Sequence, residues 1–228
     1  MLDAIYAAFA EGWSDAGGID PSRRDLTEEA IFLARLVTEL LPTEPEAPGL
    51  LALILHAEAR RRARRGSDGE YVPLAEQDPS SWDSEMIDEA EALLGRAGAL
   101  GVIGRYQLEA ALQSAHVHRR RTGQANWAAV VQLYDALSAL TGSPVVAINR
   151  AIAFAELEGA EAGLDALQEL AADPRLAEYQ PYWAARAELL ARTGARDEAR
   201  RAYEFAIGLE RDPAVRRFLQ GRRTALAD

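Results

Sequence analysis

The sequence contains no cysteine. This absence excludes a disulfide framework and any zinc or iron–sulfur site held by thiolates, and it fits a reducing compartment. No stretch approaches the roughly 18 uninterrupted apolar residues that a membrane-spanning helix needs. The N-terminus also lacks the basic region and apolar run of a signal peptide. We therefore expect a cytoplasmic protein that does not associate with a membrane.

Runs of Val, Ile and Thr at period two are missing as well, so a core built on a sheet is not expected. Alanine, leucine, glutamate and arginine dominate instead, and all four favour helices. Hydrophobic residues make up 49 % of the 228 residues, an ordinary value for a globular protein with a core. The composition predicts an all-α fold of one large or two small domains.

Acidic side chains outnumber basic ones, 36 to 25, which gives a net charge of −11. A surface this acidic repels the phosphate backbone of nucleic acids on average. We therefore expect this chain to bind a protein partner and not to bind nucleic acid directly. The sequence leaves the oligomeric state open.

Short breaks at glycine or proline divide the second half of the chain into helices of similar length. Helices are predicted at 105–121, 126–141, 144–158, 160–172, 180–193, 196–210 and 213–225. Helices joined so closely pack as antiparallel neighbours. We therefore predict stacked antiparallel helix pairs over residues 101–228.

The first 100 residues are less regular, and we expect them to form an irregular helical subdomain continuous with the second half. Helices are predicted at 3–13, from Thr27 as N-cap to about residue 41, at 45–65, and at 80–97 after an Asp78–Pro79 start signal. A short extended or hairpin segment is predicted near 66–75. The second helix carries an apolar stripe at helical spacing, which we expect to face the core: Ala30, Leu33, Ala34, Val37, Leu40 and Leu41.

A repeat signal near the C-terminus is the most specific local pattern. Two helices separated by Gly194 carry interlocking large and small residues: Trp183, Ala187 and Leu190, then Ala199, Tyr203 and Ala206. This spacing is typical of a tetratricopeptide repeat. A weaker copy comes earlier: Ala147, Ala151 and Phe154, then Gly159, then Gly163, Leu167 and Leu170. The alternative is a generic bundle with alanine-rich contacts.

No pattern for catalysis or metal binding is present. Metal ligands on a helix sit three or four residues apart, whereas His116 and His118 are two apart, and His56 is distant in sequence. Phosphate-binding loops, a nucleophile elbow and a thiol nucleophile are all missing from the sequence. We expect no catalytic residues, no metal and no cofactor. An enzyme with a helical pocket is a third possible function, after a regulatory interaction domain and a peptide-binding adaptor.

A run of arginines is the sharpest cluster of charge: Arg60, Arg61, Arg62, Arg64 and Arg65. One interpretation is a basic patch that docks an acidic partner. The other is structural, because cations at the end of a helix offset the exposed carbonyls of its last turn.

Asn149 and Arg150 lie beside the apolar stripe of a first repeat helix, where a groove would form. An asparagine in such a groove can bind a peptide backbone through its amide, or it can bond a neighbouring helix turn. Tyr106 can likewise belong to the core or to a groove, and helical spacing favours the core.

Several segments together resemble the C-terminal extension of a group of extracytoplasmic-function RNA polymerase sigma factors that carry a tetratricopeptide-like tail. The resemblance rests on segments in consistent order along nearly the whole chain: 6–13, 51–55, 58–61, 68–70, 76–78, Trp82, 106–108, 110–111, 127–135, 143–151 and 184–187. The chain departs from the family pattern at Ala10, where an Asn is expected, and at Ala57, where a His is expected. His56 lies one position out of register.

The resemblance implies a regulatory domain that acts through protein contacts with sigma regions, RNA polymerase or a regulator. It adds Arg186 to the candidate interaction residues. The two sigma regions that bind polymerase and read the promoter normally precede this extension, and they are absent from this sequence. The chain is therefore expected to be an excised domain or a stand-alone homologue. The alternative function is a free-standing adaptor that binds a peptide or protein and has no promoter role.

Overall fold

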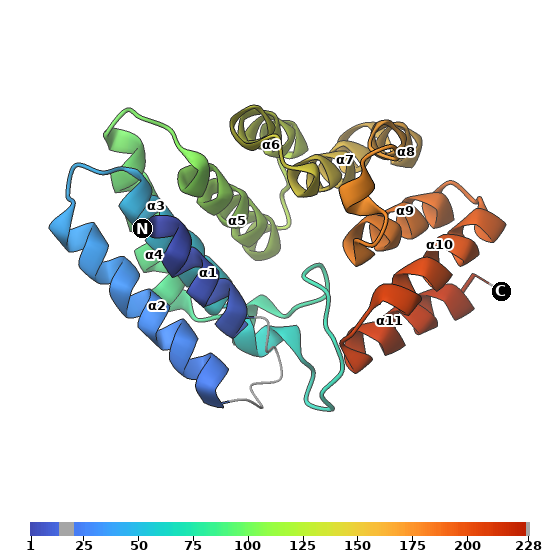
Figure 1. Cartoon of the computed structure of the whole chain (residues 1–228), viewed down its shortest axis with the longest axis horizontal. Helices are drawn as coiled ribbons and strands as arrows, with labels where there is room; N and C mark the ends of the chain where they lie inside the picture. The colour runs from blue at the N-terminus through green and yellow to red at the C-terminus, as the bar shows by residue number, and fades with distance from the viewer. Residues whose placement is uncertain (14–20, 227–228) are drawn as a thin grey trace. The chain divides into compact units, whose positions relative to one another are not determined.

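The computed structural model describes residues 1–13 and 21–226. Within these ranges it contains eleven α-helices, three short 3-10 helices and a single antiparallel bridge between Arg65 and Tyr71. The predicted all-α fold is confirmed. Among the helices described, none has both the length and the apolar character that crossing a membrane requires. The chain forms two compact units, Met1–Asn126 and Trp127–Asp228, each drawn in Figure 1.

The first unit is built around one fully buried helix. Its helices are α1 (Leu2–Trp13), α2 (Pro21–Leu40), α3 (Glu46–Glu58), α4 (Ser84–Ala99) and α5 (Arg105–Thr122). Every residue of α3 from Ala47 to His56 is buried, as expected for a helix that is apolar on all sides. Helices α1, α2, α4 and α5 all contact it, so α3 is the core of this unit (Figure 1).

Three helix boundaries in this unit differ from the sequence prediction. Helix α2 begins at Pro21 instead of Thr27, which is buried in mid-helix and donates its hydroxyl to the Arg23 carbonyl. Helix α3 ends at Glu58, where the chain tightens into the 3-10 helix η1 (Arg61–Arg64). Asp78 caps the 3-10 helix η2 (Pro79–Ser81), while α4 starts later with Asp83 as its N-cap.

Helix α5 packs with the first unit through a cap supplied by α3. The carboxylate of Glu46 accepts the backbone N–H groups of Tyr106, at 2.8 Å, and of Gln107, at 3.2 Å. These N–H groups have no partner inside their own helix, so the cap satisfies two of them. The two compact units consequently divide after Asn126, whereas the sequence pattern changes near residue 101.

The second unit consists of six helices stacked in order. They are α6 (Trp127–Thr141), α7 (Pro144–Glu158), α8 (Ala160–Glu169), α9 (Gln180–Arg192), α10 (Arg196–Leu209) and α11 (Pro213–Thr224), with the 3-10 helix η3 (Pro174–Leu176) between α8 and α9. Each helix contacts the next, and α7 also contacts α9. Contact between alternate helices is what repeated helix pairs produce, so the predicted stacking is confirmed (Figure 1).

The interlocking residues predicted from the repeat pattern lie between paired helices. Ala187 on α9 and Ala199, Tyr203 and Ala206 on α10 are buried in one cluster. In the preceding pair, a Cβ atom on Gly163 would lie 2.4 Å from the Cβ of Ala155. Helices α7 and α8 therefore approach too closely for any side chain at this position.

Candidate functional site

Two arginines of η1 hold the C-terminal end of α1. Arg61 Nη1 donates to the Gly12 carbonyl at 3.4 Å, and Arg64 Nη1 donates to the Trp13 carbonyl at 2.7 Å. These carbonyls belong to the last turn of α1 and lack partners within that helix. The arginines therefore cap a helix end, as the structural interpretation predicted. The helix that Arg61 and Arg64 cap is α1, however, and not the helix that ends just before them.

Arg60 is buried and bonded inside the first unit. Its Nε donates to the His56 carbonyl at 3.2 Å, and its Nη2 donates to Gln113 Oε1 at 2.5 Å. Burial lowers the pKa of Arg60 to about 10, and burial is also the main reason that the pKa of Arg64 falls to about 10. Both side chains remain cationic at neutral pH. Arg60 thus links α3 to α5 and is not exposed to a partner.

Arg62 is the exposed member of the run; Arg65 is half-buried beside its bridge to Tyr71. Arg61 is also half-buried. Its Nε donates to the Glu58 carboxylate at 2.8 Å. The docking interpretation of the arginine run therefore narrows to Arg62 and its immediate surroundings.

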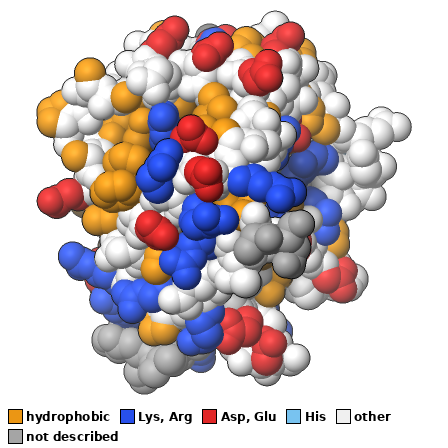
Figure 2. Space-filling model, turned by 90° about the vertical axis from the view of Figure 1, so that its right-hand side faces the viewer, with side chains coloured by type: hydrophobic (Ala, Val, Ile, Leu, Met, Phe, Trp, Pro, Cys, Tyr) orange, Lys and Arg blue, Asp and Glu red, His pale blue; other side chains and the backbone are white. Residues whose placement is uncertain are grey.

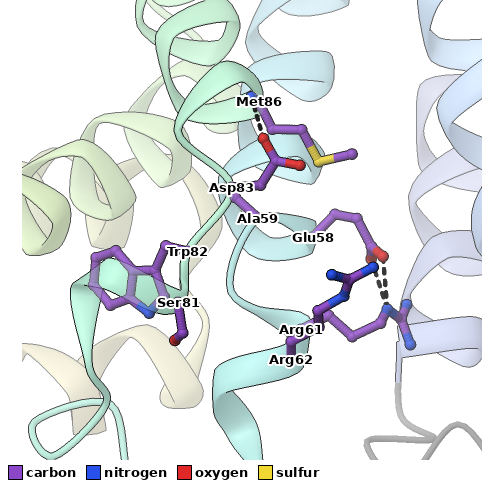
Figure 3. A pocket seen from close by; sticks show the side chains of 8 residues that line it. All are labelled: Glu58, Ala59, Arg61, Arg62, Ser81, Trp82, Asp83 and Met86. Atoms are coloured by element: carbon purple, nitrogen blue, oxygen red, sulfur yellow. Dashed lines mark hydrogen bonds and ion pairs between the residues drawn. The ribbon is translucent and has the colours of Figure 1, made fainter.

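A pocket of about 300 Å³ lies beside Arg62. Figure 3 shows Glu58, Arg61 and Arg62 on one side of it and Ser81 and Trp82 on the other. The remaining lining residues are Ala59, Asp83 and Met86. The lining combines the cations of Arg61 and Arg62, the carboxylates of Glu58 and Asp83 and the apolar side chain of Met86, while the Trp82 ring is buried and points away from the arginines. Such a mixed lining suits polar and apolar contacts with a protein segment.

Tyr106 belongs to the core of the first unit. It is buried, and its hydroxyl donates to Asp3 Oδ1 at 2.5 Å. Burial, followed by the bond to Asp3, raises the pKa of Tyr106. The side chain joins α5 to α1 and is not presented to a partner.

Asn149 and Arg150 both lie on α7, and they differ in environment. Asn149 is exposed, whereas Arg150 is half-buried, pairs through Nε with Asp135 of α6 and lies 5.6 Å from the ring centroid of Phe154. Arg150 therefore ties α6 to α7. Asn149 presents its amide to solvent, where a partner can reach it.

Arg186 lines a second pocket, of about 290 Å³, within the second unit. Its Nη1 donates to Gln168 Oε1 at 3.0 Å. The wall is aromatic: Trp183 donates its Nε1 to the Ala177 carbonyl at 2.9 Å and stacks on Phe205 with ring centroids 4.6 Å apart. The other lining residues are Ala171, Leu176 and Tyr182. An arginine beside an apolar wall suits a ligand that carries a carboxylate and an apolar group.

Arginines are also plentiful on α10 and α11, on the face shown in Figure 2, where blue side chains lie among red and orange ones. Many of them are paired: Arg222 with Glu188 at 2.6 Å, Arg200 with Asp197 at 3.4 Å, and Arg223 with Glu204 at 3.8 Å. Exposed pairs add little stability, but they compensate much of the local positive charge.

The histidines do not converge on a metal site. His56 is fully buried with Nε2 3.5 Å from Glu91 Oε1. Burial, with smaller contributions from nearby arginines, lowers the pKa of both His56 and His116 to about 4. Across residues 1–13 and 21–226, no group of three His, Asp or Glu side chains is arranged to hold a metal ion.

The apolar side chains on the outward face of α2 were not predicted from the sequence. Of the stripe predicted to face the core, Ala30, Ala34 and Val37 are buried, but Leu40 and Leu41 are exposed. Phe32 and Leu36, which the stripe omitted, are exposed as well. The signal was available, because Phe32, Leu36 and Leu40 recur every four residues along the helix.

Comparison with known proteins finds two similarities. Residues 1–98 match a family of unknown function (DUF6596). Over 205 residues, 90 % of this chain, the sequence is 41 % identical to an uncharacterised protein of Rhizobium meliloti (strain 1021). The match takes in 48 % of that protein, so this chain spans about half the length of the curated relative that it matches. No solved structure matches the chain.

Proposed function

We propose that this chain is a regulatory protein-interaction domain of, or related to, an extracytoplasmic-function RNA polymerase sigma factor. In this proposal it modulates transcription initiation through protein contacts. The observation that carries the interaction role is the stacking of helix pairs in the second unit, an architecture that offers extended binding surfaces. The link to sigma factors is supported by the sequence resemblance along nearly the whole chain.

The length of the relative is compatible with this role. A match of 205 residues is longer than either compact unit, so the region similar to this chain in the relative includes parts of both units. Roughly half of that protein lies outside the match. That remaining half leaves room for the sigma regions that the resemblance calls for.

The exposed candidates are the residues through which we propose that contact is made. Arg62 and Asn149 present their side chains to solvent, and Arg186 lines an open pocket. Arg60 and Tyr106, by contrast, stabilise the first unit from within.

The sigma link is tested with the Rhizobium meliloti relative, purified whole and without the region that matches this chain. We expect the whole protein to bind core RNA polymerase and to support transcription of promoter DNA. Removal of the matched region should change the yield of transcript. A whole protein that does not bind core polymerase would overturn the sigma link.

The residues are tested in a chimera in which this chain replaces the matched region of the relative. Arg62→Glu and Arg186→Glu should each alter transcript yield. Arg96→Glu is the matched control, because Arg96 is an exposed arginine on α4 outside both pockets. Equal effects of all three substitutions would show a response to net charge and not to these surfaces.

A second candidate function is an adaptor that binds a peptide and has no promoter role. The pocket of Arg186 favours it, because a cation next to Trp183 and Tyr182 suits an acidic peptide with an apolar side chain. Fluorescence titration of this chain with such peptides tests it directly. Peptide binding lost in Arg186→Glu, together with no binding of the chimera to polymerase, would favour the adaptor.

A further inference from the structure

Helix α2 carries a continuous apolar strip on the side that faces solvent. Phe32, Leu36 and Leu40 are 59 %, 38 % and 68 % exposed. Residues four apart lie above one another on the same face of a helix, so the three side chains form one strip. We call this strip, with the four carboxylates described next, the α2 outer face.

Carboxylates border the strip along one edge and at its N-terminal end. By helical geometry, Asp25 and Glu29 continue the same face toward the N-terminus, and Glu28 and Glu39 run along one edge. All four are exposed. Asp25, Glu28 and Glu29 form no ion pair within the part of the chain that the structure describes.

Two arginines of α2, Arg24 and Arg35, lie beside this edge, and together they do not balance the four carboxylates. Arg24 is exposed one turn before Glu28, and the described residues show no ion pair between them. Arg35 is engaged by Glu89 of α4 through two bonds, one of them at 2.7 Å from Nη2 to Oε2. Glu39 makes only a weaker electrostatic contribution at Arg35. The α2 outer face is therefore apolar along its centre and negative along an edge and one end.

The fold of the first unit does not require this strip. The opposite face of α2, with Ala30, Ala34 and Val37, already provides its share of the core. A single exposed apolar side chain needs no explanation. Three aligned along one helix, bordered by charge, are typical of a surface that another protein covers.

We propose that the α2 outer face is the docking surface for an amphipathic helix of a protein partner that carries arginine or lysine beside its apolar stripe. An apolar stripe on the partner would cover Phe32, Leu36 and Leu40, and its cations would meet Glu28 and Glu39. The inference rests on the proposed function only in requiring a protein partner. It adds the face that is used and the chemistry of the segment that binds there.

A second copy of this chain fits the face poorly. A two-fold axis that pairs two α2 helices antiparallel brings the same edge of each together, so Glu28 and Glu39 of both copies would meet. Like charges placed opposite one another oppose association. The net charge of −11 on each copy adds to the repulsion.

The probe is a synthetic peptide of about 18 residues, five helical turns, with leucines at helical spacing, arginines beside them and a fluorophore at its N-terminus. Its control is a scrambled peptide of the same composition. Fluorescence anisotropy with the complete chain should show binding of the amphipathic peptide that weakens as salt is added. The scrambled peptide should bind at least about tenfold more weakly.

Two double variants locate the site. Phe32→Ser with Leu40→Ser should raise the Kd for the amphipathic peptide by about tenfold or more. Glu28→Gln with Glu29→Gln should raise the Kd and reduce its dependence on salt. The matched control is Val102→Ser with Ile103→Ser, because these side chains are 64 % and 68 % exposed in the loop between α4 and α5; its Kd should match that of the unmodified chain.

Three results would overturn the inference. They are equal binding of the scrambled peptide, an equal loss in the control variant, and dimers of the unmodified chain in sedimentation that dissociate on Phe32→Ser with Leu40→Ser. The last result would assign the face to a second copy. The substituted side chains all point into solvent, and circular dichroism confirms that each variant is folded. No polymerase is present in this assay, so its outcome is separate from that of the transcription test.

Discussion

The guanidinium of Arg64 lies 3.5 Å from the centroid of the Trp13 ring, while its Nη1 donates to the Trp13 carbonyl at 2.7 Å. One side chain thus covers the indole and satisfies a carbonyl in the last turn of α1. The two residues are 51 positions apart in the sequence. This contact fastens the first helix to the segment that follows the buried helix α3.

Arg64→Ala should lower the free energy of unfolding of the first unit by about 1–3 kcal/mol, because it removes a cation–π contact and a charged hydrogen bond together. Arg64→Lys should recover part of the loss, since an ammonium keeps the charge but lacks the planar stack. Urea unfolding followed by tryptophan fluorescence measures both. An unchanged midpoint for Arg64→Ala would show that the contact contributes nothing.

Neighbouring arginines should differ in their contribution to stability. Arg61→Ala removes bonds to the Gly12 carbonyl, the Thr27 hydroxyl and the Glu58 carboxylate, and it should cost about 1–3 kcal/mol. Arg62→Ala changes an exposed side chain and should stay within about 0.5 kcal/mol of the unmodified protein. Thermal melts of the two variants make the comparison. Equal losses would contradict the capping role assigned to Arg61.

Gly163→Ala should destabilise the second unit. The new Cβ would meet the Ala155 Cβ at 2.4 Å and the Ala151 carbonyl oxygen at 2.9 Å, so α7 and α8 would have to separate, at about 1–3 kcal/mol. Gly208→Ala is the control, because a Cβ there meets nothing within 4 Å. It should be neutral or stabilising by up to about 1 kcal/mol. Chemical unfolding monitored by circular dichroism separates the two.

Stability should fall as the pH falls from about 6.5 toward 4. In the folded chain the pKa of His56 and of His116 is about 4, whereas an unfolded chain has histidines near pKa 6.5. Between these values the unfolded chain takes up protons that the folded chain does not, so protonation favours unfolding by on the order of a few kcal/mol. Arg60 and Arg121 face His56, and Arg119 and Arg60 face His116, so the new charges meet like charges. Glu91 offers His56 a partial counter-charge.

The measurement is urea unfolding at a series of pH values for the unmodified chain and for His56→Leu with His116→Leu. The double variant should lose less stability between pH 6.5 and 4. His118→Leu is the matched control, because His118 is exposed. A double variant with the same pH dependence as the unmodified chain would assign the acid sensitivity to carboxylates.

Much of the second unit could be predicted from the sequence, because its signals are local. Breaks such as Gly159 and Gly194 adopt positive φ angles of 103° and 82° in the structure, as the predicted turns require. Ala199 and Tyr203 follow the helical period within one helix and are buried as expected. Such pairs pack against helices that are adjacent in the sequence, so their contacts can be predicted from local sequence patterns.

The first unit was harder to predict, because the contacts that stabilise it join residues that are distant in the sequence. The arginine run is local, but the helix end that Arg61 and Arg64 cap lies about fifty residues earlier. Periodicity likewise showed apolar residues on α2 without showing which would remain uncovered. Leu40 was placed in the core stripe for that reason, although it is 68 % exposed. Only the packing of the neighbouring helices decides such cases.

The carboxylate of Glu46 makes the first turn of α5 depend on a distant part of the chain. The N–H groups of Tyr106 and Gln107 have as their acceptor a residue about sixty positions earlier in the sequence. A chain cut near residue 100 would leave α5 with a frayed first turn and α3 with one side bare. A cut between Asn126 and Trp127 would keep helix and cap together. Separate expression of residues 1–126 and 127–228 therefore offers a route to studying each unit alone.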